Sequence, residues 1–136
     1  MSVPGNYNQQ VIETFRANQG KVQGPNQLIL LTTTGAKSGQ PRTTPVAYST
    51  DSGRLVIIAS KGGAPTNPDW YFNLVANPIV TVETGTETYQ ARATVVADEA
   101  ERESLYARHA DLMPGFAEYP KKTERKIPVV LLERVS

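Results

Sequence analysis

The chain has 136 residues, 39% of them hydrophobic, and its 14 basic and 13 acidic residues leave a net charge of +1. A chain of this length is expected to build one core, and so small a charge gives no indication of nucleic-acid binding. The absence of cysteine excludes disulfides and thiolate catalysis, and a single histidine excludes a polyhistidine metal site, so we expect no metal.

The apolar runs are short. Runs such as residues 28–31 and 129–132 fall far short of the roughly 18 apolar residues that a bilayer span needs. Residues 1–10 also lack the apolar stretch of a signal peptide. We therefore expect a cytoplasmic protein without a transmembrane segment.

In chain order, the first segment, residues 1–26, is expected to be partly helical, because Val11, Ile12 and Phe15 have helical spacing. Residues 27–136 are expected to form the folded domain. Runs of β-branched and apolar residues bounded by turn signals predict six strands, which cover residues 27–33, 43–50, 54–60, 79–84, 87–97 and 127–135. Short helices are predicted over residues 69–77 and, after a capping signature at Asp98 and Glu101, up to about residue 111.

This pattern predicts a mainly β protein of the α+β class. Hairpin-linked strands interrupted only by short helices favour an antiparallel barrel over a parallel sheet.

The stretch 32–45, TTTGAKSGQPRTTP, has the residue types of a phosphate-binding loop. Lys37 and Arg42 supply cations, the threonines and Ser38 supply hydroxyls, and the glycines let backbone amides approach a ligand closely. It is not a Walker loop, because Ala36 precedes Lys37 and the prolines prevent the following helix. A solvated hairpin loop with ordinary surface charges explains the same spacing, and the pattern does not separate the two.

The stretch 59–73, ASKGGAPTNPDWYFN, follows the third strand. Ser60 and Lys61 precede a double glycine, which exposes backbone amides where a planar ring could lie, and Trp70 and Tyr71 offer aromatic faces beyond it. The competing interpretation makes Trp70 an apolar plug of the barrel.

His109 lies with Leu105 and Leu112 at helical spacing, which favours a packed or interface histidine over a catalytic base. Residues 112–126 then combine Met113, Phe116 and Tyr119 with a basic run. They are either a lid over a hydrophobic substrate or a plain connection whose cations keep the surface soluble; those cations are Lys121, Lys122, Arg125 and Lys126.

The runs LLTTTGAKSGQPRTTPV, VIIASKGGAPTNPDWYFNLVANP and IPVVLLE resemble the deazaflavin-dependent nitroreductase family of the flavin-reductase-like superfamily. The resemblance implies a six-stranded antiparallel split β-barrel of the FMN-binding type with short flanking helices. It also implies reduced coenzyme F420, a deazaflavin with a phosphodiester and an acidic glutamate tail, as hydride donor. Such a coenzyme carries the chemistry, which explains why the sequence has no acid–base constellation.

The same resemblance implies the site residues. The residues implied to bind coenzyme are Ala36, Lys37, Ser38, Arg42, Thr43, Thr44, Pro45, Val46, Ala47, Ile58, Ala59, Ser60, Lys61, Trp70, Tyr71 and Asn73. Ser60 or a nearby backbone amide is expected to stabilise developing charge, and Met113, Phe116 and Tyr119 are expected to contact the acceptor. Phe116 stands where some relatives have tyrosine.

We therefore expect a reductase that acts on a quinone, a nitro compound or an activated enone. Two alternatives stay open: a non-catalytic deazaflavin carrier and an FMN-dependent reductase of the same fold. A homodimer is possible on the pattern of such barrels. The short first segment lacks the long apolar extension of membrane-associated members, which weakens the case for peripheral membrane binding.

Overall fold

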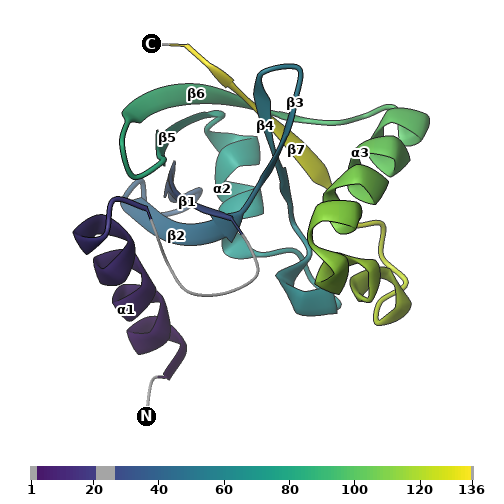
Figure 1. Ribbon diagram of the computed structural model, residues 1–136, viewed down its shortest axis with the longest axis horizontal. Helices are drawn as coiled ribbons and strands as arrows, with labels where there is room; N and C mark the ends of the chain where they lie inside the picture. The colour runs from purple at the N-terminus through teal and green to yellow at the C-terminus, as the bar shows by residue number, and fades with distance from the viewer. Residues whose placement is uncertain (1–2, 21–26, 136) are drawn as a thin grey trace.

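The computed structural model describes residues 3–20 and 27–135 (Figure 1). Its helices are α1 (Val3–Ala17), α2 (Asp69–Ala76) and α3 (Glu99–Leu112), with short 3₁₀ turns η1 (Lys61–Gly63), η2 (Pro114–Ala117) and η3 (Tyr119–Lys121). Its strands are β1 (Leu28–Thr34), β2 (Pro41–Ala47), β3 (Ser49–Asp51), β4 (Arg54–Ile58), β5 (Ile79–Glu83), β6 (Thr88–Val95) and β7 (Val129–Arg134). The expected boundary between residues 26 and 27 adjoins residues 21–26, which lie outside the described residues.

The strands form one antiparallel sheet in the order β2-β1-β5-β6-β7-β4-β3. Its two edge strands, β2 and β3, are separated in sequence by Tyr48 alone. A sheet whose opposite edges are one residue apart must curl back on itself, so the order itself requires a barrel-like shape. The predicted antiparallel barrel is confirmed.

The strand count differs from the prediction, with seven strands described instead of six. The run expected as one strand over residues 43–50 is two strands, because the chain crosses at Tyr48 from one sheet edge to the other. The Tyr48 amide still donates to the Gln27 carbonyl at 3.0 Å, in register with the β1–β2 pairing, and Ser49 already pairs with Val56 of β4. Local strand propensity does not encode this crossing.

Two apolar cores lie on opposite faces of the central strands. In β4, Ile57 packs inside the barrel against α2, whereas Val56 and Ile58 face α3 and η2. β7 alternates in the same way, with Val130 on the inner face and Leu131 on the outer face. Burial on both faces explains why these two strands read as continuous apolar runs.

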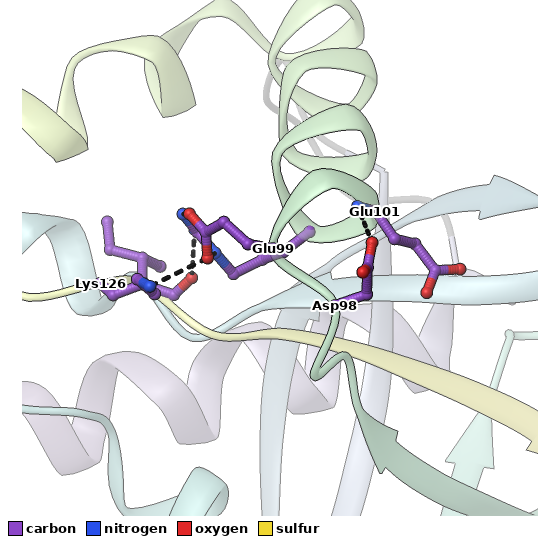
Figure 2. A network of polar contacts seen from close by, with 6 residues as sticks. Asp98, Glu99, Glu101 and Lys126 are labelled. Atoms are coloured by element: carbon purple, nitrogen blue, oxygen red, sulfur yellow. Dashed lines mark hydrogen bonds and ion pairs between the residues drawn. The ribbon is translucent and has the colours of Figure 1, made fainter.

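Helix α3 begins as predicted. The Asp98 carboxylate accepts a hydrogen bond from the Glu101 amide at 2.8 Å, which satisfies one of the free amides of the first turn (Figure 2). Glu99 beside it binds Arg102 at 2.8 Å and Lys126 at 3.0 Å, and these hydrogen bonds lower the pKa of Glu99 to about 2. The start of α3 is thus tied to the approach to β7.

Helix α1 packs against the barrel through the apolar positions that the sequence indicated. Ile12 and Phe15 are buried against Leu30 of β1, and Arg16 forms an ion pair with Glu83 of β5 at 2.8 Å. Figure 1 shows α1 beneath β2, where its N-terminal half extends away from the sheet. None of the helices in the described parts of the chain has the length and apolarity to cross a bilayer.

Candidate active site

A hollow of about 860 Å³ opens between the β1–β2 loop and α2. We call it the polar hollow. Its walls come from α1, the end of β1, the loop, the start of β2 and the first half of α2. Its lining residues are Gln9, Ile12, Thr33, Gly35, Ala36, Lys37, Ser38, Arg42, Thr43, Thr44, Asp69, Trp70, Phe72 and Asn73.

The β1–β2 loop is held in a defined conformation by Asn73 of α2. The Asn73 Oδ1 accepts from the Ala36 amide at 2.9 Å, and its Nδ2 donates to Thr33 Oγ1 at 3.2 Å. Within the loop, the Gly35 amide donates to the Gln40 carbonyl at 2.8 Å. A Cβ on Gly35 would lie 2.5 Å from Ser38 Oγ, so a side chain there would displace the Ser38 hydroxyl.

Lys37 and Arg42 are exposed at this loop, and neither forms an ion pair with any described residue. Arg16, Arg54 and Arg108 do form such ion pairs. Two cations without an ion pair, beside side-chain hydroxyls, form a donor set suited to a phosphate. Asp69 is the one carboxylate in the described lining of the polar hollow.

Half of the residues expected to bind coenzyme meet at the polar hollow. They are Ala36, Lys37, Ser38, Arg42, Thr43, Thr44, Trp70 and Asn73. Trp70 is 8% exposed and belongs to the barrel core, as the interpretation as an apolar plug expects. It also borders the polar hollow, where its ring is available to a ligand. The polar groups of Asn73 are engaged by the loop, a role that the sequence did not indicate.

The other half lie outside this lining; they are Pro45, Val46, Ala47, Ile58, Ala59, Ser60, Lys61 and Tyr71. Val46, Ile58 and Ala59 are buried core residues. Ser60 is 7% exposed, and its carbonyl accepts from the Gly63 amide at 2.9 Å. Lys61 is exposed, with its ammonium 3.5 Å from Thr66 Oγ1.

Six lining residues were not among those expected to bind coenzyme: Gln9, Ile12, Thr33, Gly35, Asp69 and Phe72. Four of them lie within the two stretches already singled out, where the Thr33 hydroxyl was counted among the phosphate-binding groups; these are Thr33, Gly35, Asp69 and Phe72. Gln9 and Ile12 reach the polar hollow only because α1 packs beside β2, and no local pattern indicated this approach.

The residues expected to contact the acceptor lie in the core between the outer face of β4 and β7, helix α3 and η2, which we call the second core. Met113 and Phe116 are buried and Tyr119 is half-buried. Phe116 stacks edge-to-face with Tyr119 at 5.1 Å, and the Tyr106 hydroxyl donates to the Phe116 carbonyl at 2.7 Å. Burial raises the pKa of Tyr106 to about 12. None of these residues borders the polar hollow.

His109 is fully buried beside them, which agrees with the packed position predicted from its helical spacing. Its Nδ1 is 2.7 Å from Ser49 Oγ, and its ring stands edge-to-face with Phe116 at 4.5 Å. Its Nε2 has no hydrogen-bond partner among the described residues. Burial lowers the pKa of His109 to about 4, so the ring is neutral at pH 7.

Comparison with known proteins assigns the chain to a family. The sequence profile of the family described as F420H(2)-dependent quinone reductase matches residues 7–134. The chain belongs to this family. An F420H(2)-dependent quinone reductase of Mycobacterium tuberculosis is 39% identical over 129 residues, covering 88% of this chain and 85% of the relative.

Solved structures agree with this assignment. One described as an F420-H2 dependent reductase has a TM-score of 0.70 and 42% identity, and the alignment covers 78% of this chain and 93% of that one. Another, described as a domain-swapped dimer, has a TM-score of 0.73 and 36% identity over 96% of this chain and 99% of that one. The resemblance to deazaflavin-dependent reductases and the split-barrel fold are confirmed.

Proposed function

We propose that this F420H(2)-dependent quinone reductase family member transfers hydride from reduced coenzyme F420 to a quinone, and that the coenzyme binds in the polar hollow. Family membership supports the reaction. The observation that supports the binding place is that Lys37 and Arg42, at the β1–β2 loop, form no ion pair with any described residue.

The residues of the polar hollow fit the coenzyme. An acidic ligand with a phosphodiester needs cations that no carboxylate already neutralises, and Lys37 and Arg42 meet that condition. The Asn73 contacts hold the loop amides in place before binding, so little ordering is left to oppose it. Trp70 offers an apolar face at the other side of the polar hollow for a planar ring.

When bound, the reduced deazaflavin supplies a hydride, so the protein is required to place two molecules and to stabilise charge. Lys37, Ser38 and Arg42 hold the phosphate and tail in this proposal. Ser60 or a backbone amide after β4 stabilises charge that develops near the ring. Met113, Phe116 and Tyr119 support the acceptor side by packing behind it, because Met113 and Phe116 are buried.

A homodimer is part of the proposal. A relative of known structure is described as a domain-swapped dimer, and α2 exposes Phe72 and Val75, which are 50% and 56% accessible. A second copy is an occupant suited to such apolar side chains. A location in the cytoplasm stays a prediction.

Anaerobic titration with F420 and with FMN, followed by turnover of a quinone with deuterium-labelled reduced F420, tests the function. We expect saturable binding of F420, weaker binding of FMN, and oxidation of one reduced F420 for each quinone reduced, with single-turnover oxidation slowed by the deuterium. Tight binding without turnover would indicate a carrier instead. Preference for FMN, or quinone reduction without matching oxidation of reduced F420, would contradict the proposal.

A further inference from the structure

The guanidinium of Arg125 holds the connection between β4 and α2, residues 59–68. Its Nε donates to the Ala64 carbonyl at 2.9 Å, one terminal nitrogen donates to Asn67 Oδ1 at 2.6 Å, and the other donates to the Ser60 carbonyl at 2.7 Å. All three acceptors are in that connection, about 60 residues earlier in the chain. No described carboxylate pairs with Arg125, and burial lowers its pKa.

The connection needs holding, because its backbone is strained. Lys61 has φ +48°, a left-handed conformation that a residue with a Cβ rarely adopts. Gly63 has φ +84°, and a Cβ there would lie 2.9 Å from Lys122 Cβ. The connection therefore packs directly against the segment that carries Arg125, with few internal hydrogen bonds of its own.

Only an arginine suits these three acceptors. Their spread matches the rigid fork of a guanidinium, whereas a lysine ammonium is a point charge that cannot reach all three at once. Arg125 belongs to the segment between α3 and β7, residues 113–128. The Tyr106 hydroxyl of α3 donates to the Phe116 carbonyl of that segment. Arg125 thus joins the proposed acceptor side of the site to the residues that follow β4.

We propose that Arg125 is a positioning residue of the reductase, which fixes Ser60 and Lys61 in the conformation that meets the coenzyme ring without itself touching coenzyme or acceptor. This inference rests on the proposed function. It assigns a role to a cation that the sequence alone placed either in a lid or among surface charges.

Hydrogen exchange of the ligand-free protein tests the contact. In Arg125→Lys and Arg125→Gln, the Gly63 and Ala64 amides, which donate to Ser60 and Lys61 carbonyls, should exchange about tenfold faster or more. The Gly35 amide of the β1–β2 loop should be unchanged. Arg102→Gln is the matched control, since Arg102 also lies beside Tyr106 but bonds Glu99 and the Ile127 carbonyl instead. Unchanged exchange at Gly63 in both Arg125 variants would overturn the inference.

Binding and turnover test the role. We expect both Arg125 variants to bind F420 about tenfold more weakly and to lower kcat, with the acceptor KM within about twofold. Millimolar guanidinium should restore part of the kcat of Arg125→Ala, whereas equal urea should not. Faster exchange with unchanged affinity and kcat would make the contact merely structural and overturn the role. If wild-type protein fails to bind F420, the proposed function fails and takes this inference with it; if it binds and the variants match it, only the inference fails.

Discussion

The polar hollow and the second core use their polar residues in opposite ways. The second core contains the residue types usually suspected of catalysis, including His109 and Tyr106, yet both are buried and serve packing. The polar hollow contains ordinary surface residues, yet Lys37 and Arg42 there have no described charge partner. The contrast teaches that the state of pairing of a side chain is more informative here than its chemical type.

Removing both cations of the polar hollow should give the largest effect. Each charge-assisted contact to a phosphate contributes about 1.5–3 kcal/mol, so Lys37→Ala/Arg42→Ala should weaken F420 binding more than about a hundredfold. The loss should shrink at high salt because these cations are exposed. Arg108→Ala/Lys126→Ala removes the same net charge elsewhere on the surface and should bind normally in the same fluorescence titration. Equal losses of F420 affinity in the two double variants would mean that the cations act only by nonspecific charge attraction.

Phe116 tests whether the second core is packing or an acceptor lid. Phe116→Ala should lower the free energy of unfolding by about 3–5 kcal/mol, because the ring is 7% exposed and contacts His109 and Tyr119. Coenzyme affinity should change only a few-fold. Urea denaturation measures the first and titration the second; Phe116→Leu, which keeps most of the volume, provides a folded variant. A raised acceptor KM without loss of stability would instead favour the lid.

His109 should make the stability depend on pH. Its pKa is about 4 when folded against an ordinary value of 6.5, so the unfolded chain binds more protons between these values. Stability is therefore full above pH 6.5 and decreases as the pH falls toward 4, by about 3 kcal/mol in total. Urea denaturation from pH 7 to 4.5 should show the slope in wild type and not in His109→Gln.

The same variant bears on the mechanism. Hydride transfer needs no protein base in this proposal, so His109→Gln should keep most of its quinone reductase activity at pH 7. Loss of activity with folding intact would assign His109 a chemical role and reverse the contrast between the two regions.

The smallest expected effect is at the start of α3. Asp98→Ala removes the acceptor of the Glu101 amide and should cost about 1 kcal/mol of stability. Affinity for F420 should not change, since α3 lies outside the lining of the polar hollow. Asp98→Asn, which keeps a capping oxygen, should lose less in thermal denaturation.

Much of the fold could be predicted because local signals agree with it. The Asp98 cap, the apolar runs of β4 and β7, and the buried pair Ile12 and Phe15 all follow from spacing. The break at Tyr48 could not be predicted, because it depends on where the edges of the sheet meet. Local signals describe the elements, and the curl of the sheet arises only from their pairing.

The site divides in the same way. Lys37 and Arg42 could be found, because a glycine-bounded loop with two cations is visible in the sequence. The roles of Asn73 and Arg125 could not, since their partners, Ala36 and Ser60, are distant in sequence. Likewise, the burial of Phe116 depends on α3 and β4 packing around it.

The most direct measurement compares F420 with its deazariboflavin core, which lacks the phosphodiester and glutamate tail. Wild-type protein should bind F420 far more tightly than this core compound, because in our proposal Lys37 and Arg42 contact only the missing groups. In Lys37→Ala/Arg42→Ala the two affinities should converge, with binding of the deazariboflavin core nearly unchanged. If the double variant still prefers F420 by the wild-type factor, the coenzyme tail does not bind at the polar hollow.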